Sequence, residues 1–374
     1  MGGTGSRTGQ RQRARVRCVA GTGAATLATA LLMTVPSGPA IAEGLHRMVV
    51  DPVGAQELHA RERWQQVADT LEGTLTTSDT LYVAADAAST LAARVAVDGW
   101  RASDVPGLVA ALLSTANPDG GYGLAKPWDA YQDGTVNPAS TSYTATTAGH
   151  VGPVLLAGYA AGVVPASAVQ RTIDFLLRLP RSFSGRCIPY SSSPHDLDKP
   201  CVWNVHYGAA DWVLHASELL DYRTADAREF ARTALSWLDD APPDATTGYW
   251  PYSSAGGAPQ DLGHQLWTAA AVDSLRGTHQ AMTLMLSRSL WRTQARVAHN
   301  TGVASAMGSI ALFDCRLARD ATVLRYALPT APGASYTVKA LAAQASAVLR
   351  TCFPTPRSSA AGRRATRPLL RDLG

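Results

Sequence analysis

The tetrapeptide Pro-Tyr-Ser-Ser occurs twice in this chain, at residues 189–192 and 251–254. Each copy is followed by a histidine that opens an apolar helical stretch, His206 after the first and His264 after the second. A loop of one design that leads into a helix of one design indicates that a single supersecondary unit repeats. We therefore expect an array of similar helical units.

Helix-like patterns of apolar residues dominate the sequence, and from residue 104 onward they alternate between two kinds. One kind is amphipathic and needs one covered face, whereas the other is apolar almost all round and must be buried on most sides. The alternation predicts an all-α fold with two concentric layers, which is an α/α toroid or a related curved stack of hairpins with long loops at one rim. Strand patterns are scarce and no hairpin signature is found. The amphipathic helices are expected at 104–116, 166–179, 224–238 and 279–291, the apolar ones at 142–160, 204–220, 263–276 and 299–314, and others at 58–71, 81–97 and 335–351.

The first 42 residues have the composition of a secretory signal peptide. Five arginines and no acid precede an apolar run at 18–35, and the small-residue stretch Ala-Ile-Ala at 40–42 follows. This order is typical of a signal that is cleaved after Ala42 and exported by the Sec or Tat route. An uncleaved anchor is the alternative, because the run is near the lower length limit for a membrane span.

Charge and composition argue against a nucleic-acid partner for the mature chain. Cleavage would remove five positive charges and no negative one, so the formal net charge would change from +4 to −1. A basic surface for phosphate binding then loses its main support. We expect a single domain at 43–353, a basic disordered tail at 354–374, no membrane span after cleavage and a monomeric state.

Four cysteines remain after cleavage, and an even number in an exported chain predicts two disulfides. Proximity pairs Cys187 with Cys201, and Cys315 with Cys352. Closing the first loop would contribute up to about 3 kcal/mol. A zinc site is the alternative, but the sequence has no Cys-x-x-Cys, so we predict neither a metal nor a cofactor.

The segment Pro-Asp-Gly-Gly-Tyr-Gly at 118–123, followed by Thr-Ser-Tyr-Thr at 141–144, resembles the repeat of the terpenoid cyclase and protein prenyltransferase superfamily. In that family a Gly-Gly-aromatic-Gly turn precedes each inner helix of an α/α toroid. Looser copies stand at 187–190 and 249–252, so the resemblance covers about residues 100–315. The Asp-x-Asp-Asp motif of the squalene–hopene cyclases and the Asp/Cys/His zinc set of the prenyltransferases are not found. The resemblance therefore implies a fold and not an activity.

Four aromatic rings are expected at one rim of the toroid. Aligning the apolar helices on their C-terminal leucines places these rings near the start of each inner helix, at one mouth of the central cavity. We predict that they form a ligand site with Tyr122 of the preceding turn and with His150, two turns after the first ring on nearly the same face. For His150, a satisfied core residue is the alternative. The four rim residues are Tyr143, His206, His264 and His299.

Two helix starts carry residues suited to proton transfer. Asn204 and His206 are residue types that a β-eliminating polysaccharide lyase uses, the amide to bind a uronate carboxyl and the imidazole to remove the α-proton. Asn204 is alternatively a helix N-cap. Asp261 and His264 are three residues apart, so the acid can orient the histidine as a general base. A cap at Asp261 and a loop hydrogen bond at His264 are the alternative.

Aromatic and acidic loop residues complete the predicted site. Tyr190 and Tyr252 are expected to assist the base, and Trp250 and Trp267 are expected to stack on sugar rings or to anchor the core. In the loop at 123–141, Trp128 and Asp129 are further candidates, because carboxylate pairs carry out glycoside hydrolysis and polar loops of this length are often functional. Loop aspartates are alternatively turn formers.

These observations predict an exported toroid that binds an extended ligand, a glycan, at its mouth. If the protein is an enzyme, it is a polysaccharide lyase or a glycoside hydrolase. A non-catalytic binding or scaffold toroid is one alternative. A toroid with an isoprenoid- or lipid-binding cavity is the other, and it would have a deep, aromatic-lined interior.

Overall fold

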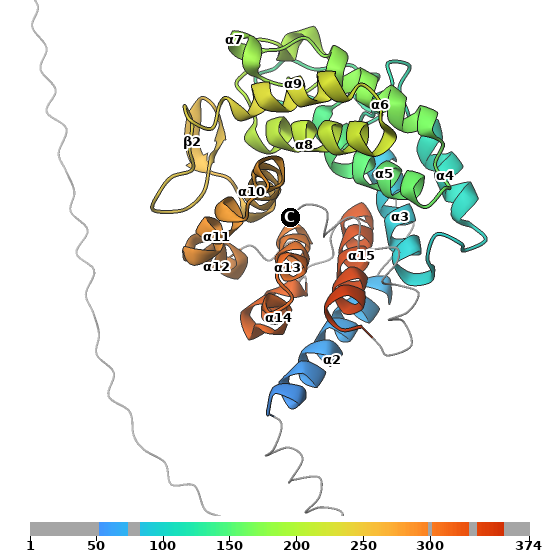
Figure 1. Cartoon of the computed structure of the whole chain (residues 1–374), viewed down its shortest axis with the longest axis vertical. Coiled ribbons are helices and arrows are strands. Elements are labelled where there is room, and N and C mark those ends of the chain that lie inside the picture. The colour runs from blue at the N-terminus through green and yellow to red at the C-terminus, as the bar shows by residue number, and fades with distance from the viewer. Residues whose placement is uncertain (1–51, 74–82, 298–300, 329–334, 355–374) are drawn as a thin grey trace, which may run out of the picture. The chain divides into compact units, whose positions relative to one another are not determined.

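Helices make up nearly all of the regular structure in the computed structural model, which describes residues 52–73, 83–297, 301–328 and 335–354 (Figure 1). The prediction of an all-α fold is therefore confirmed. All described residues belong to one unit that begins at Pro52.

One set of helices, the first-row helices, succeed one another along a closed path within this unit (Figure 1). Each packs against the next in chain order, and α15 at the end packs against α3 at the beginning. A helix with neighbours on several sides needs apolar side chains over most of its circumference, which these sequences supply. The set is α3 (Val83–Asp98), η1 (Ala145–Val151) with its continuation α5 (Gly152–Ala160), α8 (Trp203–Leu220), α10 (Leu262–Arg276), α13 (Thr301–Phe313) and α15 (Ser335–Cys352).

The second-row helices each follow a first-row helix and pack against it. In α6, for example, Val169, Ile173 and Leu176 form a buried stripe, as an amphipathic helix with one covered face requires. The preceding helix α2 (Pro52–Gly73) packs against α15. The second row is α4 (Val105–Ser114), α6 (Ala166–Arg178), α9 (Thr224–Leu235), α11 (Gln280–Ser287) and α14 (Ala321–Ala327).

The structure departs from the sequence prediction at several elements. The helix expected at 279–291 is divided into α11 and α12 (Leu290–Val297), and α14 was not predicted. A two-stranded hairpin, β1 (Pro251–Ser253) and β2 (Gly256–Pro259), contradicts the expectation of no hairpin. Glycines with positive φ at its turn make it possible. Short helical turns also occur at α7 (Phe183–Arg186), η2 (Pro194–Asp196) and η3 (Leu317–Arg319).

The first-row helix that carries His150 begins with a π-helical segment, η1. Pro153 stands in the first turn of the following helix α5. Proline has no N–H to donate and its ring crowds the preceding turn, so the wider π-helical turn accommodates it.

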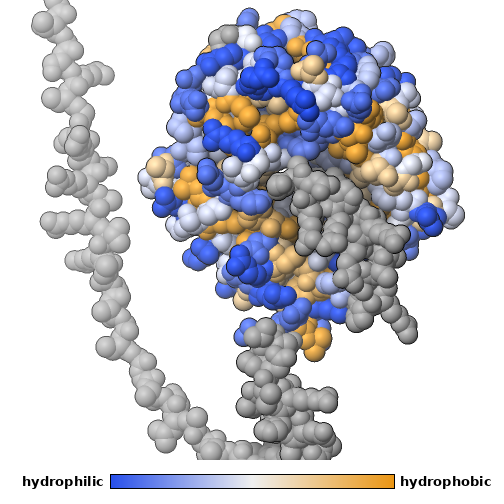
Figure 2. Space-filling model, viewed as in Figure 1, coloured by the Kyte–Doolittle hydropathy of each residue, from blue (hydrophilic) through white to orange (hydrophobic). Residues whose placement is uncertain are grey.

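Two buried clusters of apolar side chains form the core. Trp64, Trp203 and Trp291 lie in one, and Leu91 and Ile173 lie in the other. On the face shown in Figure 2, apolar residues form separate patches among polar ones. Most large apolar side chains are therefore used inside the unit.

Both predicted disulfides are present. Cys187 pairs with Cys201 and Cys315 pairs with Cys352, with Cα–Cα separations of 5.6 and 5.1 Å. None of the helices described here is both long enough and apolar enough to cross a bilayer. The predicted signal peptide at 1–42 and all but the first residue of the predicted tail at 354–374 lie outside the described residues.

Candidate functional site

Both Pro-Tyr-Ser-Ser loops attach to the start of a first-row helix through the same hydrogen bonds. Ser192 donates its N–H to the carbonyl of Ser142 (2.9 Å), and its Oγ accepts from the Ser142 N–H (3.1 Å). Ser254 makes the same two bonds with Cys201, at 2.8 and 2.9 Å. Ser142 precedes η1 and Cys201 precedes α8, so each loop crosses the start of the preceding first-row helix. The tyrosine of each motif is therefore at an equivalent position in two successive repeats.

A second contact occurs in three repeats and explains the polar residues near the helix starts. In each case a side chain in the first turns of a first-row helix accepts the N–H of a residue in the loop before it. The chemical type of the acceptor differs, but its function is the same: it fixes the loop to the helix. The pairs are Tyr122 N–H to Thr147 Oγ1 (2.9 Å), Ile188 N–H to His206 Nδ1 (3.2 Å) and Trp250 N–H to Gln265 Oε1 (3.0 Å).

His206 is a core residue, which corrects its predicted place at the rim. Its side chain is 0% exposed. Because Nδ1 accepts a loop N–H, the ring proton is on Nε2, which donates to the carbonyl of Ala234 in α9 (3.1 Å). Burial lowers the pKa of His206 to about 4, so the ring is neutral. The sequence alignment of the apolar helices on their C-terminal leucines is therefore out of register. The hydrogen bonds match His206 with Gln265 and not with His264.

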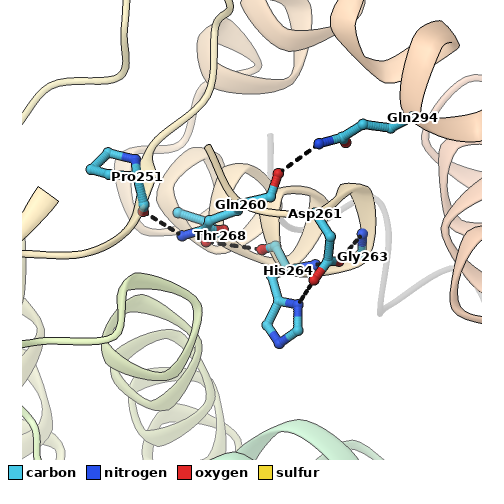
Figure 3. Close-up of polar contacts among 7 residues, drawn as sticks. All are labelled: Pro251, Gln260, Asp261, Gly263, His264, Thr268 and Gln294. Atoms are coloured by element: carbon cyan, nitrogen blue, oxygen red, sulfur yellow. Dashed lines mark hydrogen bonds and ion pairs between the residues drawn. The ribbon is translucent and has the colours of Figure 1, made fainter. Parts of the chain in front are cut away.

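Asp261 and His264 pair at the first turn of α10 (Figure 3). One carboxylate oxygen of Asp261 accepts from the N–H groups of Gly263 (2.9 Å) and His264 (3.1 Å), which caps the helix. The other oxygen contacts Nδ1 of His264. The side chain of Asp261 is 65% exposed and that of His264 is 40% exposed. The cap and the orienting contact, which the sequence left as alternatives, occur together.

The protonation of this pair suits a base. Burial acts to raise the pKa of Asp261, but the hydrogen bond and charge of His264, with two backbone N–H groups, outweigh it and hold the pKa below its ordinary value. The carboxylate is thus ionised at neutral pH and accepts the Nδ1–H of His264. The other ring nitrogen, Nε2, is on the side of the ring away from Asp261 (Figure 3).

One loop tyrosine contacts this pair, and two tyrosines from other loops contact each other. The ring of Tyr252 is edge-on to His264, with centroids 5.4 Å apart. Tyr190 contacts Tyr131 (5.7 Å) and Tyr143 (6.0 Å) in the same edge-to-face manner. Such contacts hold aromatic side chains in fixed orientations. We call the group the tyrosine–histidine cluster, and its members are Tyr131, Tyr190, Tyr252, Asp261 and His264.

The hydroxyls of Tyr131 and Tyr252 remain protonated. Burial raises the pKa of Tyr252, and the charge of Asp261 raises it further. Burial is also the main cause that raises the pKa of Tyr131, with contributions from Asp196, Tyr190 and Tyr252. These two hydroxyls are therefore proton donors at neutral pH.

An ion pair joins the two long loops that supply Tyr131 and Tyr190. Lys199, in the loop closed by the Cys187–Cys201 disulfide, contacts the carboxylate of Asp133, and its Nζ lies 5.7 Å from the centroid of Tyr131. Lys199 lowers the pKa of Asp133 to about 2. Asp133 is therefore held as a charged partner of lysine.

Asp129 and Trp128 have structural roles in the same loop. Asp129 accepts the N–H groups of Asp133 (3.2 Å) and Gly134 (2.8 Å), so the turn-forming alternative describes it. The backbone of Trp128 exchanges two hydrogen bonds with Asn137, at 3.0 and 2.8 Å. Both residues shape the loop that carries Tyr131.

A buried carboxylate lies behind the cluster. Asp196 is 3% exposed and accepts hydrogen bonds from Asn137 Nδ2 (3.1 Å) and from the hydroxyl of Ser191. Tyr143, predicted at the rim, is 2% exposed and lies beneath Tyr190. Tyr143 thus supports the cluster and does not form its surface.

Trp267 reaches from α10 past α8 to η1. An ideal Cβ on Gly149 of η1 would lie 2.6 Å from Cζ2 of its indole, and one on Gly208 of α8 would lie 2.5 Å from the same atom. Only glycine leaves room for the ring at these two positions. Trp267 is partly exposed and lies one turn after His264.

His150 lies close to the same group. Its side chain is exposed, yet burial lowers its pKa and the charge of His264 lowers it further. His150, a predicted ligand residue, thus interacts electrostatically with His264 of the cluster.

Three other predicted ligand residues are buried elsewhere. Asn204 is 3% exposed and lies inside α8, whose N-cap is Val202, so neither the ligand contact nor the cap describes it. Trp250 is 1% exposed and donates Nε1–H to the carbonyl of Ala241 (3.0 Å), as a core anchor. Tyr122 is 2% exposed, and burial raises its pKa to about 12. His299 lies outside the described residues.

Sequence reasoning missed Tyr131 and Lys199. Tyr131 stands three residues after Trp128 in a long polar loop, and an aromatic side chain in such a loop is a usable signal. Lys199 carries no comparable signal, because a loop lysine is most often solvated. Its position depends on the ion pair with Asp133.

Metal binding is poorly supported by the donor sets of the described residues. The grouping whose donor atoms lie close enough is Cys187, Cys201 and His206. Its two sulfurs are joined in a disulfide and offer no thiolate. This grouping therefore does not suit zinc.

Comparisons with protein-family models, curated proteins and solved structures found no match. The function is therefore argued from the side chains and their geometry.

Proposed function

We propose that the unit is an α/α toroid in which the first-row helices form the inner layer. Two observations support this. The first-row helices pack in succession and α15 returns to α3, and the second-row helices pack on them one by one. The repeated serine contacts also support it, because the loops before α8 and α10 bind the starts of η1 and α8 in the same way. The tyrosine–histidine cluster would then occupy one mouth of the ring.

We propose that this mouth binds an extended glycan and that the protein is an exported polysaccharide lyase. The observation that carries the proposal is the contact chain Asp261–His264–Tyr252, in which an exposed histidine has an ionised acid on one nitrogen and a tyrosine ring at 5.4 Å. Tyr131 and Tyr190 supply further aromatic surface for sugar rings. Two disulfides support an oxidising, extracellular location.

The chemistry follows from the protonation states of the cluster. In β-elimination, Nε2 of His264 removes the proton on the carbon next to the uronate carboxyl, and Asp261 stabilises the imidazolium that forms. The electron pair forms a carbon–carbon double bond as the bond to the leaving glycosidic oxygen breaks. Tyr252, which keeps its proton at neutral pH, donates it to that oxygen. The products are a new chain end and an unsaturated sugar.

The test is a screen of the mature protein against anionic and neutral polysaccharides. Absorbance of unsaturated ends reports elimination, and new reducing ends without that absorbance report hydrolysis. We expect elimination on a uronate polymer, with kcat reduced about 100-fold or more in His264→Ala and Asp261→Asn. His279→Ala is the matched control, since it also removes an exposed histidine ring and should retain activity.

A scaffold protein would give a different result. It would bind a polysaccharide without turnover, and His264→Ala would weaken binding only. Because His264 is exposed, its replacement should hardly change the unfolding temperature. A large loss of stability would identify the pair as structural and would contradict the proposal.

A further inference from the structure

A stretch of the chain beside the cluster is rich in arginine and has no acidic residue. Between Asp273 and Asp314 the sequence contains no aspartate or glutamate, and it contains four arginines. Three of these, Arg288, Arg292 and Arg296, stand at four-residue intervals on and just before α12. We call these three the α12 basic patch.

The α12 basic patch is open to solvent and carries uncompensated charge. All three side chains are exposed, and within the described part of the chain none of them forms an ion pair. Two other exposed arginines differ: Arg228 pairs with Glu218, and Arg232 pairs with Glu229. The α12 arginines have no acidic partner among the described residues and can therefore meet an external anion.

The contacts of α12 place this helix at the proposed mouth. Gln294, between Arg292 and Arg296, donates its side-chain N–H to the carbonyl of Gln260 (2.9 Å), one residue before Asp261 (Figure 3). The carboxylate of Asp261 is engaged by His264 and by the first turn of α10, and among the described residues it forms no ion pair with the neighbouring arginines.

The like charges of the α12 basic patch repel one another, and a bound anion would relieve this repulsion. Arg292 and Arg296 are one helical turn apart, about 6 Å along the axis, and like charges at this spacing repel. Arg288 lies before the positive end of the helix dipole, where a cation is disfavoured. A guanidinium binds carboxylate and sulfate oxygens in pairs, so a chain of regularly spaced anions would meet several of them at once.

The other acids near the cluster leave room for an anionic ligand. Asp133 is paired with Lys199, Asp129 accepts two backbone N–H groups, and Asp196 is buried under Ser191. Each of these three carboxylates thus has a hydrogen-bond or ion-pair partner within the protein. The charged side chains of α12 itself are all positive.

We propose that the α12 basic patch binds an anionic polysaccharide and delivers it to the tyrosine–histidine cluster. This inference rests on the proposed function, because it names the substrate class of the same mouth. The patch is a binding surface and takes no part in proton transfer. Neutral glycans would gain nothing from it.

The test compares Arg288→Gln/Arg292→Gln/Arg296→Gln with a control of equal charge change, Arg101→Gln/Arg228→Gln/Arg232→Gln, in the mature protein. Binding of polygalacturonate, dextran sulfate and neutral dextran is measured over a range of salt concentrations. We expect the first variant to bind both polyanions about tenfold or more weakly and to lower the slope of log affinity against log salt by about 3. The control should bind as the wild type does, and dextran should bind none of them tightly.

The outcomes separate this inference from the proposed function. The inference would be overturned if both triple variants lost polyanion affinity equally or if the wild type bound no polyanion. It would also be overturned if the wild type bound anionic lipid vesicles but none of the polysaccharides. Turnover of a neutral glycan that is unchanged in the α12 variant would also overturn it while leaving the mouth catalytic. Polyanion binding through α12 with no turnover would retain it and remove only the lyase chemistry.

Discussion

The pH dependence of stability provides a direct test of the structural role of His206. The side chain is fully buried, Nδ1 accepts the Ile188 N–H, and Nε2 donates to the Ala234 carbonyl. Burial lowers its pKa from 6.5 to about 4. Because protonation of Nδ1 would destroy its acceptor, the folded protein holds the neutral ring.

The magnitude follows from proton linkage. A histidine whose folded pKa lies below its unfolded value contributes stability that is complete above about pH 6.5 and is lost as the pH falls toward 4. A shift from 6.5 to about 4 corresponds to a loss of about 2 kcal/mol at pH 5 and about 3 kcal/mol at pH 4. Carboxylates add their own dependence, so the informative quantity is a difference between variants.

The matched variant is His206→Gln, because Gln265 makes the equivalent contact in the next repeat. The glutamine amide can accept the Ile188 N–H without titrating. Loss of the contacts that the imidazole makes with Trp203 and Tyr207 should lower the free energy of unfolding by about 1–2 kcal/mol at pH 7. Urea unfolding from pH 7 to pH 4 should give a flatter stability curve for this variant. Equal slopes in wild type and variant would show that His206 is not a buried neutral acceptor, and the reasoning would fail.

Two further predictions test the packing of the repeats. Gly208→Ala should destabilise the protein by about 1–3 kcal/mol, because its Cβ would overlap the Trp267 indole, whereas Gly107→Ala, with no atom within 4 Å of the new Cβ, should be neutral or stabilising in urea unfolding. Equal effects of the two changes would mean that Trp267 is free to move. Ser192→Ala and Ser254→Ala should each lower the free energy of unfolding by about 1–2 kcal/mol, and the two losses should be similar, because each change removes the Oγ acceptor of one backbone N–H. Unequal losses in calorimetry would contradict the equivalence of the two loops.

The sequence by itself determined most of the helices, the repeat, the disulfide pairing and the Asp261–His264 contact. These depend on spacing along the chain. Apolar periodicity marks a helix wherever its neighbours lie, and residues three apart share a helix face in any fold. The same local rules missed the break between α11 and α12, where Arg288 and Ser289 leave the helical path.

Only the tertiary structure decided which polar residues serve the core and which face solvent. His206 and His264 look alike in sequence, each at the start of an apolar helix after a Pro-Tyr-Ser-Ser loop. One accepts a hydrogen bond from Ile188, 18 residues away, and the other pairs with its own helix cap. Likewise, Tyr131 and Lys199 meet only because two loops are folded together.

What separates two identical residue types here is the set of partners that distant parts of the chain bring to them. An imidazole surrounded by loop and helix backbone is forced to be neutral, whereas one at an open helix start keeps a nitrogen for an external proton. The loop before α8 and the helix α9 supply those partners for His206, and no spacing along the chain encodes them.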